Sequence, residues 1–443
     1  MRFEINQPFA PRYEKIPVAE RLGHVKHICM PQPALSSRFT TALQGLSPRS
    51  EDYVPDIVRL ILTEARAGRA SDVHLVPSES ALVMQWRVDG VLHSIAGFDR
   101  DLSPRIIARL KVTCGLLTYR TDVPQEGRVA REHSATEVRV TTFPTLHGEK
   151  AAIRLFAEND QLQRLGQLGL PPEVLATLRR NLEATSGVIL LTGPSGSGKT
   201  TTAYACLRDI VADSKGSRCI MTLEDPIEVA VDGATQSQVR PSAGFDLATG
   251  LRSLMRQDPD VILVGEIRDP QTAEAAFQAA LTGHLVLTTF HAGSTAEAMT
   301  RLLDMEIEPY LLRSGLRSVI CQRLLRRACS ECESSRSIAA NPENAVTLSD
   351  KSNPHGAHRS TCSNCGSTGY LGRLVLAEML DPDEPEIARA ILQRCDARQL
   401  ASLAESVGMQ TLQQAADAAV VSGLTTIEEV LRVLGGRRKV TSG

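Results

Sequence analysis

The stretch GVILLTGPSGSGKT, Gly187 to Thr200, carries the most specific pattern in this 443-residue chain. Val188 to Leu191 form a short apolar segment that predicts a strand, and we expect a helix to begin at Lys199. Between them, GPSGSGKT matches G-x-x-x-x-G-K-[ST] at every fixed position. Glycines let the backbone wrap closely around phosphate, and the helix N-terminus favours an anion. The pattern therefore predicts a phosphate-binding loop.

This loop predicts a site for ATP and magnesium. Lys199 should reach the β- and γ-phosphates, and the Thr200 hydroxyl should ligate Mg²⁺. The rival interpretation, a flexible Gly/Ser-rich turn, leaves the strand, the lysine, the threonine and the helix unexplained. The residues that we expect to bind the nucleotide are Gly193, Pro194, Ser195, Gly196, Ser197, Gly198, Lys199, Thr200 and Thr201.

Two acidic residues follow predicted strands elsewhere in the same region. The segment CIMTLEDPIE places Glu224 at the end of one strand, and VILVGE places Glu266 after another. ATP hydrolysis needs one carboxylate to orient the attacking water and one to fix the water shell of the metal. We assign Glu224 to the water and Glu266 to magnesium. The reverse assignment stays open, as does the possibility that both are ordinary loop carboxylates.

The order of predicted elements indicates the fold class. Strands and helices alternate after residue 170, which predicts an α/β domain with a parallel sheet and helices on both of its faces. The preceding region combines alternating strands, the hairpin pair Asp89-Gly90 and two helical stretches, which is typical of a small α+β domain. The predicted parts are a lead-in (1–50), the α+β domain (51–157), a linker (158–170) and the α/β domain (171–443) with a cysteine-bearing insertion (329–369) and terminal helices (386–436).

Two arginines of the first domain are candidates for a phosphate contact. Arg139 and Arg154 lie on two predicted strands, and they face one another if the hairpin is centred between Leu146 and His147. Like charges directly across a ladder are unfavourable unless an anion lies between them. A γ-phosphate presented by another domain or subunit would be such an anion. A solvated face is the alternative.

Three further residues complete the candidate catalytic set. Arg252 and Arg256 are four positions apart in TGLRSLMRQDPD, so they should share one helical face. His291 follows the strand LVLTTF and could sense the γ-phosphate, although a histidine at a strand end is more often structural.

The insertion carries a metal-binding pattern. Cys329-x-x-Cys332 and Cys362-x-x-Cys365 form two thiolate pairs, which suit tetrahedral zinc in a structural role. A redox pair and exposed unliganded cysteines are the alternatives.

Composition limits the partners and the location. Lys and Arg total 49 against 51 Asp and Glu, which gives no general electrostatic reason to bind nucleic acid. No apolar run approaches the roughly 20 residues of a membrane span, and the N-terminus has no signal-peptide core. We therefore expect a cytoplasmic protein without a transmembrane segment, which reaches a membrane through partners.

These motifs, in this order, resemble the type II secretion and type IV pilus assembly ATPase family. The resemblance covers roughly residues 50–440. It rests on ASDVHL, RVDGVL, PQEGR, GPSGSGKTT, LEDPIE, LRSLMRQDPDVILVGEIRD, ALTGHLVLTTFHA, the two C-x-x-C pairs and GYLGR. The chain departs from the family in a short lead-in and in Glu126, where aspartate is usual.

The resemblance implies a PAS-like domain before a RecA-like P-loop ATPase domain, assembled as a hexamer. It implies that Arg139 and Arg154 are offered by the first domain and that Arg252 and Arg256 belong to the ATPase domain. It further implies hydrolysis of Mg-ATP, a zinc insertion and an inner-membrane platform protein as partner, with secretion, pilus assembly and competence left open. A DNA-translocating RecA-like motor is the alternative function, and a non-catalytic nucleotide-dependent scaffold is a second one.

Overall fold

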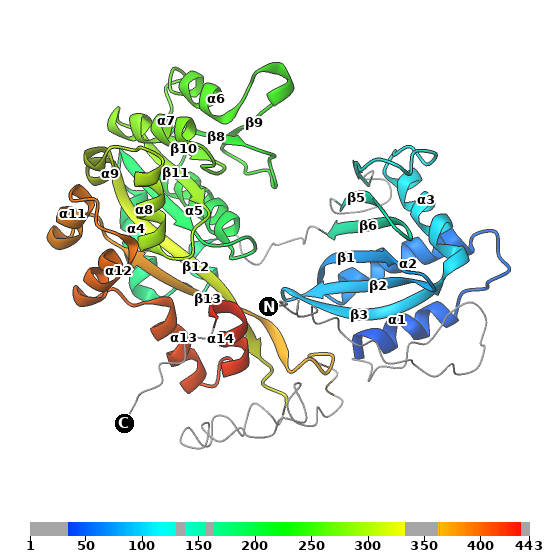
Figure 1. The fold of residues 1–443 in the computed structure, drawn as a ribbon. Coiled ribbons are helices and arrows are strands. Elements are labelled where there is room, and N and C mark those ends of the chain that lie inside the picture. The colour runs from blue at the N-terminus through cyan, green and yellow to red at the C-terminus, as the bar shows by residue number, and fades with distance from the viewer. Residues whose placement is uncertain (1–33, 130–137, 156–163, 333–361, 363, 436–443) are drawn as a thin grey trace, which may run out of the picture. The chain divides into compact units, whose positions relative to one another are not determined.

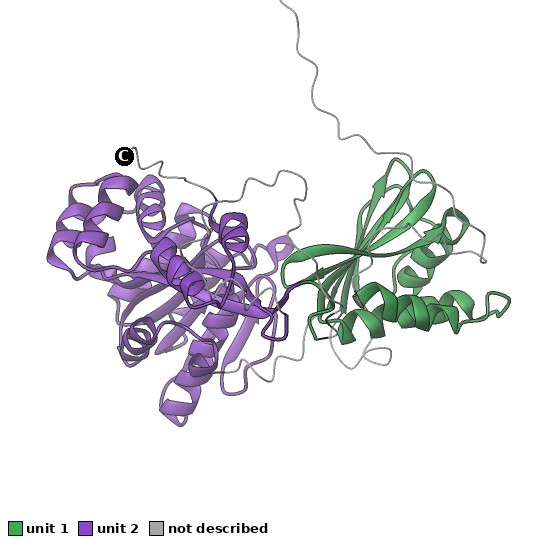
Figure 2. Cartoon of the chain, turned by 90° about the horizontal axis from the view of Figure 1, so that it is seen from below, with its two compact units in different colours: residues 1–158, 359–368 green, residues 159–358, 369–443 purple. Residues whose placement is uncertain are grey.

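The computed structural model describes residues 34–129, 138–155, 164–332, 362 and 364–435. It divides the chain into two compact units (Figure 2), one of residues 1–158 with 359–368 and one of residues 159–358 with 369–443. The predicted fold class is confirmed, because a smaller α+β unit precedes an α/β unit (Figure 1).

The first unit is a six-stranded antiparallel sheet in the order β3-β2-β1-β6-β5-β4. Its strands are β1 (Ala70–Pro77), β2 (Ala81–Val88), β3 (Val91–Asp99), β4 (Gln125–Arg128), β5 (Val138–Thr145) and β6 (Gly148–Leu155). Its helices are α1 (Ala34–Gln44), α2 (Tyr53–Ala67) and α3 (Ser103–Thr113). The β2–β3 turn is made by Asp89 and Gly90, both with positive φ, as the hairpin signal predicted.

The core of this unit lies on one face of the sheet, under its helices. Alternate strand residues such as Val73 and Trp86 point into it, as the period of two requires. Phe39 of α1 is fully buried, with its ring 6.0 Å from that of Trp86. The unit therefore begins before residue 51, the predicted boundary. The sequence signal was weak there because α1 contributes few large apolar residues and follows a proline-rich segment.

The second unit is built on a seven-stranded sheet in the order β13-β12-β7-β11-β10-β8-β9. Every neighbouring pair is parallel except β12 with β13. The strands are β7 (Gly187–Thr192), β8 (Ile220–Glu224), β9 (Thr235–Gln238), β10 (Val261–Val264), β11 (Leu285–Phe290), β12 (Leu316–Ala328) and β13 (Tyr370–Leu380).

Helices cover both faces of this sheet, as the alternating pattern predicted. One face packs against α6 (Leu247–Leu254), α7 (Pro270–Leu281), α8 (Thr295–Asp304), α9 (Pro309–Gly315), α11 (Pro385–Leu392) and α12 (Ala397–Ser406). The other packs against α4 (Pro172–Leu182) and α5 (Lys199–Ser214). Val188 and Leu190 face the first layer and Ile189 faces the second, so β7 is buried on both sides.

The predicted linker leads into the second unit, and the predicted insertion connects two of its strands. Positions 158–163 of the linker and 333–361 and 363 of the insertion lie outside the described residues. The two units divide after Glu158, but Leu165 and Leu170, also assigned to the linker, are buried in the core of the second unit. Strand β12 ends at Ala328 and β13 begins at Tyr370, so the insertion joins two antiparallel strands. Helices α13 (Leu412–Val421) and α14 (Ile427–Leu434) pack on these strands. Among the described residues, no helix has both the length and the apolarity that a membrane crossing requires.

Candidate active site

The glycine-rich loop joins the end of β7 to the start of α5, as the sequence predicted. Gly193, Gly196 and Gly198 all have positive φ, a backbone region that only glycine enters without strain. A Cβ on Gly193 would lie 2.6 Å from the carbonyl oxygen of Gln322 on β12 and would displace the loop. The loop is therefore held tightly against the neighbouring strand, and its backbone can approach a ligand closely.

Lys199 opens helix α5 and turns back over the loop. Its Nζ donates to the carbonyl oxygens of Gly193 at 2.9 Å and Pro194 at 3.0 Å, and only 7% of the residue is exposed. Burial lowers the pKa of Lys199, and the nearby Glu266 carboxylate opposes this shift. Lys199 is thus a mostly desolvated cation in the phosphate loop, next to an acid.

Glu266 lies just past the end of β10 and is partly exposed. Its Oε2 atom lies 3.1 Å from Nε2 of His291, and its other oxygen contacts the Arg268 guanidinium. His291 follows β11, and its carbonyl oxygen accepts a hydrogen bond from Arg301. The structure therefore brings Glu266 and His291 together at the carboxyl ends of two adjacent parallel strands.

Glu224 ends β8 and is buried, with 4% of the residue exposed. Its Oε1 accepts hydrogen bonds from Thr222 at 2.6 Å and from Gln236 at 3.0 Å. Its Oε2 accepts a bond from the hydroxyl of Tyr204, which lies on α5. Burial and this bond raise the pKa of Tyr204, so the hydroxyl stays a neutral donor. Both carboxylate oxygens of Glu224 are thus occupied by protein donors.

The strand order places Glu266 and Glu224 at different distances from the phosphate loop. β10 is the second strand from β7 and β8 is the third. At about 4.8 Å per strand, these strands lie about 10 and 14 Å from β7. Glu266 therefore follows the nearer strand.

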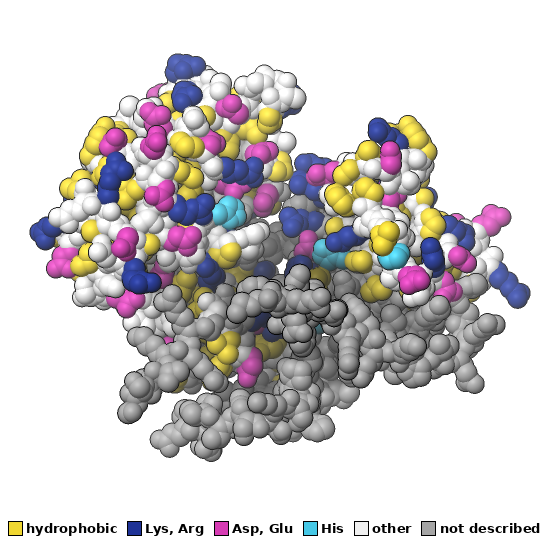
Figure 3. All heavy atoms as spheres, viewed as in Figure 1, with side chains coloured by type: hydrophobic (Ala, Val, Ile, Leu, Met, Phe, Trp, Pro, Cys, Tyr) yellow, Lys and Arg dark blue, Asp and Glu magenta, His cyan; other side chains and the backbone are white. Residues whose placement is uncertain are grey.

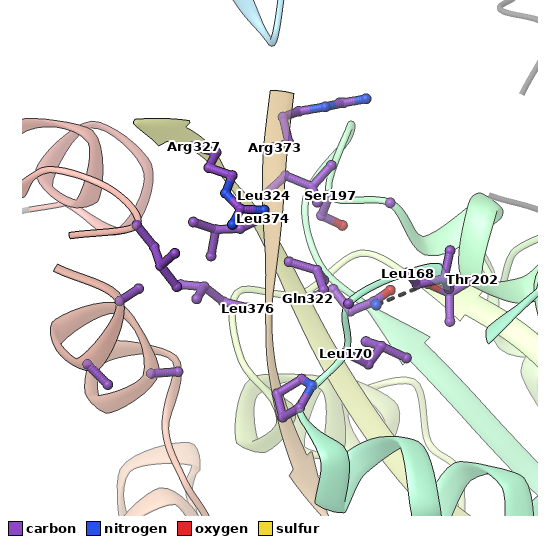
Figure 4. Close-up of a pocket in the computed structure, with 18 of the residues that line it drawn as sticks. Leu168, Leu170, Ser197, Thr202, Gln322, Leu324, Arg327, Arg373, Leu374 and Leu376 are labelled. Atoms are coloured by element: carbon purple, nitrogen blue, oxygen red, sulfur yellow. Dashed lines mark hydrogen bonds between the residues drawn. The ribbon is translucent and has the colours of Figure 1, made fainter. Parts of the chain in front are cut away.

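A cavity of about 710 Å³ lies beside the phosphate loop (Figure 4). Ser197, Gly198, Thr201 and Thr202 line it from the loop and α5, and Leu168 and Leu170 line it from the segment before α4. Leu324 and Arg327 of β12, Arg373, Leu374 and Leu376 of β13, and residues of α13 and the turn after it, complete the wall. The sequence does not indicate this cavity, because its wall combines residues from distant parts of the chain.

The first unit carries Arg139 and Arg154 on β5 and β6. They face one another across the ladder, and Thr145 faces Gly148 at its end, so the predicted register is confirmed. Nε of Arg139 lies 3.4 Å from Oε1 of Glu126, and Nε of Arg154 donates a hydrogen bond to Oδ1 of Asp72 at 3.2 Å. In Figure 3, basic side chains of this unit gather beside β5 and β6.

The other two predicted arginines do not share a helical face. Helix α6 ends at Leu254, so Arg256 lies past its end. There its guanidinium donates to the carbonyl oxygen of Arg252 at 2.8 Å. The prediction of a shared helical face was wrong because α6 ends before Arg256. Both arginines are exposed.

The four predicted metal ligands come together. The Sγ atoms of Cys329, Cys332, Cys362 and Cys365 lie within 4.8 Å of one another, and three of these residues are buried. Four thiolates around zinc at about 2.3 Å would stand about 3.8 Å apart, so the cluster fits this ion.

Sequence reasoning missed the residues that hold Glu224. Tyr204 and Gln236 carry no motif of their own, and only the fold brings α5 and β9 beside the end of β8. The spacing of Tyr204 from Lys199 did place it one to two turns into the helix, which was the available signal.

Comparison with known proteins agrees with this arrangement. Residues 48–432 match the family model of the type II/IV secretion system protein. The type II secretion system protein E of Xanthomonas campestris pv. campestris is 39% identical over 407 residues, which are 90% of this chain and 70% of that protein. The type IV pilus assembly ATPase PilB of Thermus thermophilus is 36% identical over 387 residues, 86% of this chain and 43% of that protein.

Solved structures show the same fold. The pilus retraction motor PilT with bound ADP is 26% identical with a TM-score of 0.56, over 84% of this chain and 96% of that one. The ATPase DotB of Legionella pneumophila, at 22% identity and a TM-score of 0.62, covers 87% of this chain and 97% of that one, and supports the fold alone. The chain therefore belongs to the type II/IV secretion system protein family and is an ATPase of the secretion and pilus-assembly class.

Proposed function

We propose that this chain hydrolyses Mg-ATP at the loop of residues 193–201 to power protein secretion or type IV pilus assembly. The observation that carries the proposal is the phosphate loop with its buried Lys199 near a carboxylate, Glu266, that contacts a histidine. Lysine and backbone N–H groups would bind the phosphates, and the Thr200 hydroxyl would ligate magnesium. Magnesium would supply charge neutralisation of the phosphates when bound.

We further propose that Glu266, and not Glu224, orients the attacking water. Glu224 is buried and accepts three hydrogen bonds, from Thr222, Gln236 and Tyr204, which leaves about one of its roughly four acceptor positions for a water. Each oxygen of Glu266 contacts one side chain, Arg268 or His291. Glu266 is partly exposed and follows the strand nearer the loop. The role of orienting water thus moves from Glu224, to which the sequence assigned it, to Glu266, and Glu224 becomes a buried support between α5 and β9. His291 would hold Glu266 by its ring nitrogen.

The cavity beside the loop is proposed to receive the nucleoside. It continues directly from Ser197 and Thr201, so a nucleotide bound by its phosphates extends into it. Leucines from three segments offer apolar contact to a base, and Arg327 and Arg373 offer donors.

The arginines and the assembly are proposed from the family resemblance and from charge. Arg139 and Arg154 face one another on an exposed side of their sheet, which suits a shared anion such as an ATP phosphate. Arg252 and Arg256 are proposed to contribute to the ATPase unit. We propose a hexamer that docks on a membrane-bound platform protein at the cytoplasmic face, with zinc in the four-cysteine cluster as a structural ion and no nucleic acid as partner.

Steady-state phosphate release tests this proposal. Wild-type protein, Glu266→Gln and Glu224→Gln are assayed with and without Mg²⁺, over a range of protein concentrations. We expect Glu266→Gln to lose at least a hundredfold in kcat, and Glu224→Gln to lose much less at equal folded concentration. Specific activity that rises with protein concentration would support a site completed between subunits. Equal losses for the two variants would contradict the division of roles, and DNA-stimulated turnover would favour a nucleic-acid motor.

A further inference from the structure

A row of charged side chains crosses the first unit on the sheet face opposite its core. The strand register places Arg128, Arg139, Arg154, Asp72 and Arg87 side by side on five successive strands, β4, β5, β6, β1 and β2. Asp72 is the one acidic member of this row. It stands between Arg154 on β6 and Arg87 on β2.

A β-bulge aims the Asp72 side chain. Ala70 pairs with Val88 and Asp72 pairs with Arg87, so Ser71 is the extra residue. Bulges of this kind redirect side chains and are common next to functional sites. Here the bulge places the Ser71 hydroxyl 2.9 Å from Oδ2 of Asp72, where it donates a hydrogen bond. The Asp72 carboxylate is thus fixed at the edge of the bulge, with 16% of its side chain exposed.

The two oxygens of Asp72 serve different arginines. Oδ1 accepts from Nε of Arg154 at 3.2 Å, and Oδ2 lies 3.8 Å from Nε of Arg87. Arg87 is also anchored by its NH1 group, which donates to the carbonyl oxygen of Gly90 at 3.1 Å. Asp72 holds Arg154 by Nε, on one side of the planar guanidinium, so the terminal amino group on the other side points away from the carboxylate. The Arg154 side chain is 65% exposed.

We propose that Asp72 is a positioning residue for Arg154, which it orients for contact with an ATP phosphate. The inference rests on the proposed role of Arg154. A long arginine side chain loses considerable conformational entropy when it is fixed, and a side-on ion pair made beforehand removes part of that loss from the catalytic step. Asp72 remains bound to Nε while the terminal amino group on the other side of the guanidinium meets the anion. The other acid near the row, Glu126, lies against Arg139 with a 59% exposed side chain and gives less restraint.

A double-mutant cycle tests the inference. The variants are Asp72→Asn, Arg154→Ala and the combination, assayed in the full chain for kcat and KM of Mg-ATP hydrolysis. We expect Arg154→Ala to lower kcat at least a hundredfold and Asp72→Asn to lower it about tenfold, with KM changed less than twofold. The double variant should equal Arg154→Ala, because Asp72 has nothing left to orient. Glu79→Gln, an exposed acid of the same unit, is the matched control and should behave as wild type.

Folding is monitored in the same variants by the fluorescence of Trp86, the single tryptophan, which lies in the core of this unit. If Asp72→Asn does not fold, Ser71→Ala replaces it, with an expected drop in kcat of about threefold that disappears when Arg154 is alanine.

Three results would overturn the inference. If Asp72→Asn keeps the wild-type kcat while Arg154→Ala is impaired, the proposed role of Asp72 is wrong and that of Arg154 stands. Additive losses in the double variant would show that Asp72 acts elsewhere. Wild-type turnover in Arg154→Ala would remove both the arginine role and the inference that rests on it.

Discussion

Replacing Tyr204 by phenylalanine tests the view that Glu224 is a buried support. The substitution removes one hydroxyl without changing the shape of the ring. Glu224 then keeps two of its three side-chain donors, and the Glu228 N–H, which donates to the same hydroxyl at 3.1 Å, loses its acceptor. A hydrogen bond to a charged group contributes about 1.5–3 kcal/mol, and a neutral one about 1 kcal/mol. We expect the second unit to lose about 3 kcal/mol of unfolding free energy.

The chain offers an internal control for this experiment. Trp86 is the only tryptophan and reports on the first unit, whereas far-UV circular dichroism follows both units. In urea, Tyr204→Phe should shift the transition seen by circular dichroism and leave the Trp86 fluorescence transition in place. Tyr310→Phe, at a residue that is 60% exposed, should shift neither. Turnover of folded Tyr204→Phe should stay within about fivefold of wild type. A shift below about 1 kcal/mol, or an equal shift in the Trp86 signal, would show that the Tyr204 hydroxyl does not stabilise the second unit through Glu224.

Three further outcomes follow from other parts of the chain. Glu429 is fully buried and accepts hydrogen bonds from Arg326 and Arg432, so Glu429→Gln should cost about 3 kcal/mol in urea unfolding at pH 7. Burial alone would raise the pKa of Glu429, but these bonds outweigh it and hold the pKa below its ordinary value. The contribution of Glu429 to the unfolding free energy is therefore present above the unfolded pKa of about 4.3 and should fade as pH falls below it. A difference in unfolding free energy between wild type and variant that is unchanged at pH 3 would contradict this expectation. A chelator that removes the ion from the four-cysteine cluster should release about one zinc per chain, measured by atomic absorption, and should increase proteolysis between β12 and β13. A protein that contains no metal and whose cleavage is unchanged by the chelator would contradict a zinc site. Gly193→Ala should abolish binding of a fluorescent ATP analogue while the Trp86 transition is kept, because the added methyl meets the Gln322 carbonyl oxygen; binding within threefold of wild type would show that the loop can adjust.

The elements of the second unit and the cysteine pairs could be predicted from the sequence because their signals are local. The phosphate loop, the helix at Lys199 and the paired cysteines each occupy a few consecutive residues. The register of Arg139 and Arg154 was also accessible, since a short hairpin turn sets the pairing of every residue behind it.

The role of Glu224 and the start of the first unit could not be predicted, because both depend on contacts between distant segments. Tyr204 and Gln236 reach Glu224 from α5 and β9, and these contacts led us to propose that it is a buried support. Its distance from the loop follows from strand order, which inserts β11 and β10 between β7 and β8. No spacing pattern in the sequence indicates either the hydrogen-bond donors of Glu224 or the order of the strands. In the same way, α1 joins the first core through Phe39, whose partners lie on strands far along the chain.

A single-turnover measurement tests the central claim, which is hydrolysis of bound Mg-ATP with Glu266 orienting the water. Enzyme in excess over radiolabelled ATP is mixed with Mg²⁺ and quenched at successive times, and ADP and retained ATP are separated. We expect wild-type protein to convert the bound ATP, and Glu266→Gln to bind ATP equally well but to convert it at least a hundredfold more slowly. Conversion by Glu266→Gln at the wild-type rate, together with a block in Glu224→Gln, would show that Glu224 orients the water, as the sequence indicated.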